Sequence, residues 1–124
     1  MTISQLVGLT LYALGMAFGQ FLFKSAADRY AMTEAHTLSD HVVRFLKLAL
    51  DPLFVIAIVL YMSLSIFWVW MLSFTPLSRA YPFGALAFVF TLVIAVLFFR
   101  ETVTRTHLIG LACILSGILI ISRG

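Results

Sequence analysis

The polar residues that could do chemistry in this chain are few, and they gather at the ends of apolar stretches. Gln20 and Lys24 lie four residues apart, so they share one face of a helix. In the next stretch Tyr61 and Trp68 fall on one face, with Ser65 between them. These two faces predict a binding site, in which Lys24 supplies charge and the rings line a slot for an acyl or isoprenoid chain. For Trp68, packing or anchoring at an interface is an equally good interpretation.

Further candidates flank two later stretches. Arg79 and Tyr81 precede an apolar run, and a guanidinium there can bind a phosphate through two parallel hydrogen bonds. Pro76 and Pro82 bracket this turn, and Pro82 suits the first turn of a helix because its missing amide costs little there. Glu101 lies among arginines, so we expect it to form a loop salt bridge or a helix cap.

The sequence lacks the residue patterns of metal sites, enzymes and disulfides. His36, His41 and His107 lie in predicted loops without the spacing of metal ligands, so we expect them to be solvated and expect no metal or cofactor. The sequence has neither a phosphate-binding glycine loop nor a nucleophile–base pair, so we do not expect an enzyme. Cys113 is the single cysteine, which excludes an internal disulfide and favours a small packing residue.

The composition restricts the class of protein that carries these residues. Of the 124 residues, 63% are hydrophobic and 10% are charged, whereas a soluble domain is about 25% charged. So few charges cannot cover a soluble globule of this size. The net charge of +3 is too sparse for nucleic acid and suits the loops of a membrane protein. The chain is therefore predicted to be an integral membrane protein.

Four helical spans account for the length, because each needs roughly 20 apolar residues. We predict an all-α protein, a single four-helix transmembrane domain over residues 1–124, and a first span retained rather than cleaved as a signal peptide. The predicted spans cover about 3–23, 53–74, 80–99 and 105–122.

The distribution of Lys and Arg predicts the orientation. The connection 24–51 and the last one together carry six basic residues, against two on the other side. We therefore expect the termini in the periplasm and the long first loop in the cytoplasm.

The second half of that long loop is predicted to form a short amphipathic helix in the membrane interface. Ser39 can cap a helix that starts at Asp40, and apolar residues then recur at helical spacing up to Pro52. Arg44 and Lys47 lie on its polar side. They either bind anionic lipid headgroups or only orient the protein, and the second interpretation is slightly favoured.

Small residues mark helix faces that can pack closely. Gly15 and Gly19 are four apart in the first span, as are Cys113 and Gly117 in the last, and Gly110 shares the face of Gly117. These pairs predict close neighbours for the first and last spans.

Three motifs together resemble the drug/metabolite transporter superfamily, in its EamA-like and small multidrug resistance-like four-helix groups. Residues 75–82 read TPLSRAYP and are similar to its "P-L-S-x-A-Y-P" turn. Gly19, Gln20 and Lys24 resemble its "G-Q-x-x-x-K" helix end, and Glu101 followed by Gly110 and Gly117 resembles its ending.

Two groups of the superfamily compete for this sequence. Small multidrug resistance exporters need a glutamate in the first helix, but residues 14–17 read LGMA, and the exporters' first loop is short. The chain is more similar to the subunits of the aminoarabinose-phosphoundecaprenol flippase. That resemblance implies a bacterial inner-membrane subunit that moves a polyprenyl-phosphate-linked sugar or related anionic lipid.

The resemblance also implies a partner, because four helices enclose too little for such a path and the family pairs its halves. We expect a homodimer, or a heterodimer with a similar small subunit, packed partly through the helix of Gly110 and Gly117. Two alternatives stay open: an exporter of cationic drugs or small metabolites, and a non-transporting adaptor for a glycosyltransferase that docks on the long loop.

Overall fold

The computed structural model describes residues 2–29 and 37–124, and the described part is helical without strands. Its elements are α1 (Ile3–Arg29), α2 (Leu38–Ala49), α3 (Pro52–Leu72), α4 (Leu77–Ala80), the 3₁₀ segment η1 (Tyr81–Ala85), α5 (Leu86–Phe99) and α6 (Arg105–Arg123). By length and composition four stretches can cross a membrane: α1, α3, the continuous run Leu77–Phe99, and α6. The predicted all-α fold with four spanning helices is confirmed.

The first span is longer than its apolar stretch. The helix continues from Phe23 to Arg29, and Lys24 Nζ lies 3.2 Å from Asp28 Oδ1 one turn along. Such a pair stabilises the extra turns, so the helix extends beyond the end of the apolar stretch.

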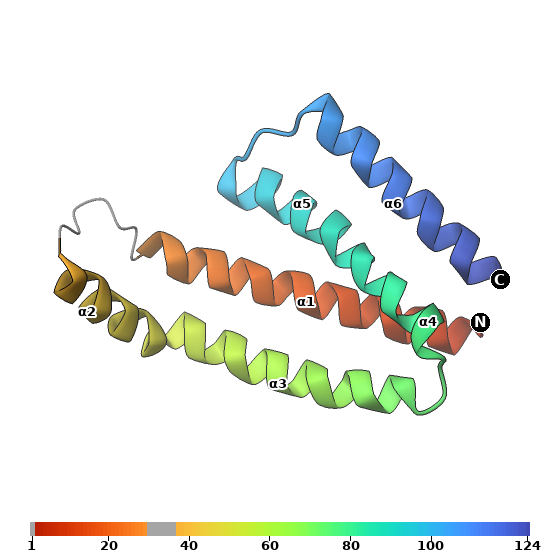
Figure 1. The fold of residues 1–124 in the computed structure, drawn as a ribbon, viewed down its shortest axis with the longest axis horizontal. Coiled ribbons are helices and arrows are strands. Elements are labelled where there is room, and N and C mark those ends of the chain that lie inside the picture. Colours follow the sequence, from red (N-terminus) through yellow and green to blue (C-terminus); the bar gives the residue numbers. More distant parts are fainter. Residues whose placement is uncertain (1, 30–36) are drawn as a thin grey trace.

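Helix α1 is the centre of the molecule, with α3 and α5 on either side of it (Figure 1). Its contact with α3 depends on small residues. A Cβ added at Gly19 would lie 2.6 Å from the Tyr61 ring, and one at Gly15 would lie 2.7 Å from Leu64. Both glycines therefore contribute to packing within this subunit, where they let α3 approach α1 closely.

The best-buried cluster lies where the chain termini meet, at one end of the molecule (Figure 1). Leu9 and Met71 are fully buried there and pack with Ala80, Phe83 and Ile118. Ile118 is the one buried residue of α6. Helix α6 is thus held mainly through η1 and through a smaller contact with α5, and most of its surface is uncovered.

Helix α2 is amphipathic, as predicted, but its cap is not Ser39. The Thr37 side chain accepts a hydrogen bond from the Asp40 backbone amide at 3.3 Å, so the helix already begins at Leu38. None of its residues is buried, and apolar side chains such as Phe45 and Leu50 are exposed. The helix leads directly into α3 and extends beyond the end of α1 (Figure 1).

The junction of α2 and α3 is held by a buried carboxylate. Asp51 Oδ1 accepts the Leu53 amide at 2.9 Å and so caps α3, with Pro52 in the first turn. Arg29 Nη1 lies 3.4 Å from Asp51 Oδ2, which connects the end of α1 to the start of α3.

The third span begins earlier than residue 80. Pro76 starts helix α4, and the chain then tightens into η1 at Tyr81–Ala85 before α5 continues. Pro82 lies in that first 3₁₀ turn and has no amide to donate, which favours a local departure from the α-helical pattern.

Candidate functional site

A short hydrogen-bonded chain joins α1 to α3 at the middle of the molecule. Gln20 Nε2 donates to Tyr61 Oη at 3.0 Å, and Tyr61 Oη donates to the Met16 carbonyl at 3.1 Å. The ring of Tyr61 also covers Gly19 and stacks on Phe23, with centroids 5.1 Å apart. The sequence candidates Gln20 and Tyr61 therefore meet, and the position of the amide is fixed.

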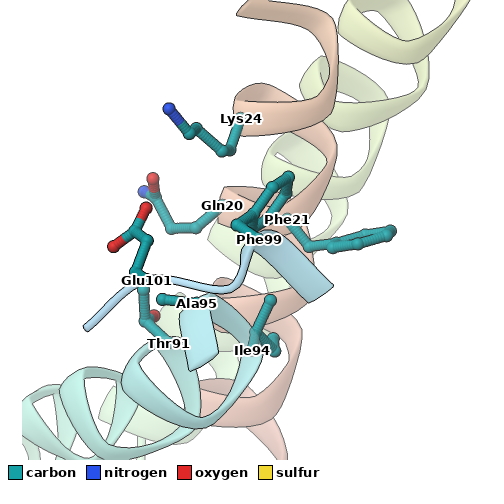
Figure 2. Close-up of a pocket in the computed structure, with 8 residues that line it drawn as sticks. All are labelled: Gln20, Phe21, Lys24, Thr91, Ile94, Ala95, Phe99 and Glu101. Carbon is teal, nitrogen blue, oxygen red and sulfur yellow. The ribbon is translucent and has the colours of Figure 1, made fainter. Parts of the chain in front are cut away.

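One pocket of about 210 Å³, called here the charged pocket, opens between α1 and the end of α5 (Figure 2). Its polar lining comes from Gln20, Lys24 and Glu101, with Thr91 deeper on α5. Its apolar lining is Phe21, Ile94, Ala95 and Phe99. The pocket thus brings together three predicted site residues that are far apart in the sequence.

Lys24 is the single cation that lines the charged pocket. Its ammonium group is half-exposed and pairs with Asp28, which does not line the pocket. An exposed i,i+4 pair of this kind is weak, so it does not prevent Lys24 from binding an anionic group.

Glu101 forms neither the loop salt bridge nor the helix cap that the sequence predicted. Glu101 is in no ion pair with another described residue, so it has no salt bridge with its neighbouring arginines. The cap of α6 is Thr104, whose side chain accepts the His107 amide at 3.3 Å. The carboxylate of Glu101 instead points towards Gln20, with Lys24 beyond it (Figure 2).

The backbone at the end of α5 explains this direction. Arg100 is left-handed, with φ 54°, and the Glu101 amide then donates to the Ala95 carbonyl at 3.1 Å. This turn folds the chain back over the end of α5 and presents Glu101 to α1.

A second pocket, called here the aromatic pocket, lies nearer the chain termini and measures about 410 Å³. Tyr12 and Trp68 line it with their ring centroids 4.8 Å apart. Tyr81 and Pro82 of η1 line it as well, together with Met16, Gly84, Ala85 and Phe88. Trp68 and Tyr81, which the sequence placed in separate motifs, are thus on one surface.

Both pockets lie along one stripe of α1. Tyr12 and Met16 line the aromatic pocket, and Gln20 and Lys24 line the charged pocket, at intervals of four residues. Tyr12 was not among the residues predicted from the sequence, although its spacing from Gln20 was the available signal. The α5 residues that line the charged pocket were not predicted either, because hydropathy alone does not say which face of α5 turns towards α1.

Arg79 lies apart from both pockets. Its Nη2 donates to the Gly124 carbonyl at 2.7 Å. Helix α4 lies beside the N-terminal end of α1 (Figure 1), whereas Lys24 lies near the C-terminal end of α1. The two candidate phosphate-binding cations are therefore separated by the length of the molecule. They cannot hold one phosphate together in this conformation.

The remaining candidates lie on outer surfaces. A Cβ added at Gly110 or Gly117 would meet no atom within 4 Å, and Cys113 on the same helix is exposed. Arg44 and Lys47 lie on α2, Arg44 half-covered and Lys47 exposed. Within residues 2–29 and 37–124, no three His, Cys, Asp or Glu side chains group as metal ligands. His36 lies outside the described residues.

Comparison with known proteins assigns the family. The sequence profile of transmembrane family 234 matches residues 11–122. The chain belongs to transmembrane family 234.

Named relatives of this family member are flippase subunits. A probable 4-amino-4-deoxy-L-arabinose-phosphoundecaprenol flippase subunit ArnE of Yersinia pestis (strain Pestoides F) is 34% identical over 114 residues, 92% of each chain. The subunit of the same name from Yersinia pseudotuberculosis (strain IP 31758) gives the same values. That of Hamiltonella defensa is 35% identical over 57 residues, 46% of this chain and 51% of the relative.

No solved structure matches the chain. The four apolar helices and these bacterial relatives make this family member a multi-pass bacterial membrane protein, similar along nearly its whole length to small flippase subunits.

Proposed function

We propose that the chain is one subunit of a flippase that moves a polyprenyl-phosphate-linked sugar, or a related anionic lipid, across the bacterial inner membrane. One observation carries this proposal. A single stripe of α1 connects a pocket that contains a cation, Lys24, to a pocket lined by Tyr12, Trp68 and Tyr81. A lipid-linked phosphate needs charge at the interface and apolar, aromatic walls deeper in. The names of the relatives support the same assignment.

The absence of an acidic group within α1 argues against proton-coupled exchange. Asp28 is the one carboxylate of Ile3–Arg29, and it lies in the last turn, beyond the apolar stretch. Proton-driven transporters usually have an ionisable group within the membrane. Proton release on addition of a quaternary ammonium drug would favour the exporter alternative instead.

A partner subunit completes the proposal. The aromatic and charged pockets are open clefts on one chain, and α6 presents Gly110 and Gly117 with no atom against them. We infer a homodimer or a heterodimer with a similar small subunit, in which the second half closes the path. With six basic residues against two, the termini are proposed to face the periplasm and the long loop the cytoplasm.

Translocation in proteoliposomes tests the proposed function. We expect Lys24→Ala and Arg79→Ala each to slow the transfer of a fluorescent prenyl-phosphate sugar by about tenfold, because the phosphate is proposed to meet Lys24 on one face of the membrane and Arg79 on the other. His41→Ala, on the exposed side of α2, is the control and should keep the wild-type rate. Equal rates for all three variants would contradict the two proposed phosphate contacts, and no transfer by the wild type with its partner subunit would contradict the function.

A further inference from the structure

The charged pocket holds groups of both signs, which binding of a phosphate alone does not explain. Lys24 and Glu101 both line it, and the Asp28 carboxylate lies 3.2 Å from the Lys24 ammonium group. A bare phosphate that entered would meet the Glu101 carboxylate as well as the Lys24 ammonium group. Like charges in one pocket oppose binding, so the pocket suits a ligand with both charges better than one that is only anionic.

Glu101 has no structural task that accounts for its position. It is exposed and forms no ion pair with a described residue, and helix α6 is capped by Thr104 without it. Its direction depends on the left-handed Arg100, a conformation unfavourable for a residue with a Cβ. Observed strain of this kind is a reason to look for function.

We propose that Glu101 is a specificity-determining residue that binds a protonated amine on the transported headgroup while Lys24 binds its phosphate. The inference rests on the proposed function and deepens it: the pocket selects a zwitterionic headgroup over one that is only anionic. The amine would offset the Glu101 carboxylate, which otherwise repels the phosphate. Figure 2 shows both side chains on the same side of the pocket, one from α1 and one from the turn after α5.

The pocket has the size for such a headgroup and not for a lipid tail. Its volume of about 210 Å³ is half that of the aromatic pocket. The polar groups lie at its α1 side and at the Glu101 turn, and the rest of its lining is apolar apart from Thr91. A hydrogen bond between an ammonium and a carboxylate is charge-assisted, and its loss weakens binding by about tenfold or more.

Two matched probes test the assignment. One is a fluorescent short-chain prenyl phosphate that carries an aminopentose, and the other is the same compound with its amine N-formylated. Binding of each is measured to the full protein in nanodiscs, together with its partner subunit if the active form is a heterodimer. For the wild type we expect the free amine to bind about tenfold more tightly than the formylated probe.

The variants separate this inference from the proposed function. Glu101→Gln should reduce the preference to about one and leave binding of the formylated probe equal or stronger. Lys24→Gln should weaken both probes and keep the preference. Asp28→Asn, which removes an equal charge four residues from Lys24 but outside the pocket lining, should also keep the preference.

An unchanged preference in Glu101→Gln, or no preference in the wild type, would overturn the assignment of Glu101 while the phosphate site at Lys24 stands. Failure of the wild type to bind either probe would overturn the phosphate site as well. Because Glu101 is exposed and without a described ion-pair partner, the Gln variant should fold normally, which thermal unfolding in detergent checks.

Discussion

At the scale of single residues, Tyr61 combines packing contacts and hydrogen bonds between the two helices. Its ring lies against Gly19, and its hydroxyl group joins the Gln20 amide to the Met16 carbonyl. A side chain that packs and hydrogen-bonds at one point fixes both the distance and the rotation between two helices. The place of Gln20 in the charged pocket therefore depends on the packing beneath it.

Gly19 gives a direct test of this packing. We expect Gly19→Ala to lower the free energy of unfolding by about 1–3 kcal/mol, because the new Cβ would lie 2.6 Å from the Tyr61 ring. Unfolding in mixed micelles, followed by circular dichroism, measures the change.

Gly84→Ala is the matched control, since a Cβ added there meets nothing within 4 Å. It should change stability by less than about 0.5 kcal/mol. Equal stability of the two variants would show that α1 and α3 are not held together at Gly19.

At the scale of helices and turns, the apolar runs predicted which segments are helical, because hydropathy over 20 residues is a local property. The ends were less predictable. Helix α1 passes Phe23 because the Lys24–Asp28 pair and two alanines favour further turns, and α2 starts from Thr37 because its side chain reaches the Asp40 amide.

The candidate site was predictable only in part, for a related reason. Gln20 and Lys24 share a face by spacing alone. Glu101 joins them only because Arg100 is left-handed, and the sequence has no glycine at that position to indicate this conformation. Tyr12 meets Trp68 of α3, and lines one pocket with Tyr81 of η1, only because α1 turns that face towards both elements. Contacts between helices depend on their rotation in the bundle, which a single sequence does not specify.

Helix α2 carries a prediction of its own. Its exposed apolar side, which includes Leu46, should lie in the headgroup region of the membrane, because exposure of this apolar surface to water is unfavourable. With Cys113→Ala as background, a bimane label at Leu46→Cys should emit at shorter wavelength in nanodiscs than one at Lys47→Cys on the polar side. Equal emission at the two positions would place α2 in water or against protein.

At the scale of the whole molecule, α6 is the part that the chain leaves uncovered. It packs through Ile118 and presents Gly110 and Gly117 outward, whereas the glycines of α1 are covered by α3. A helix with an open small-residue face in lipid suits close approach by another helix. The contrast between these two sets of glycines supports a partner on α6.

Substitution at Gly117 tests that partner. We expect Gly117→Leu to weaken association by about tenfold or more, because the larger side chain keeps the helices apart. Energy transfer between donor- and acceptor-labelled subunits in liposomes measures association. Ala112→Leu, on the other side of α6, should associate like the wild type, and so should Gly117→Leu if the interface lies elsewhere.

The length of α1 has a consequence for the membranes in which the protein can work. Its 27 residues measure about 40 Å, whereas the 21 residues of α3 measure about 31 Å, close to the hydrocarbon thickness. Gln5 Nε2 donates to the Phe74 carbonyl at 2.8 Å and fixes the two helices level at one end, so the surplus all emerges at the other, with Lys24 and Asp28. A thicker bilayer would draw these charges towards the hydrocarbon, and a thinner one would raise them clear of it. The depth at which the Lys24 ammonium group lies therefore depends on the thickness of the bilayer.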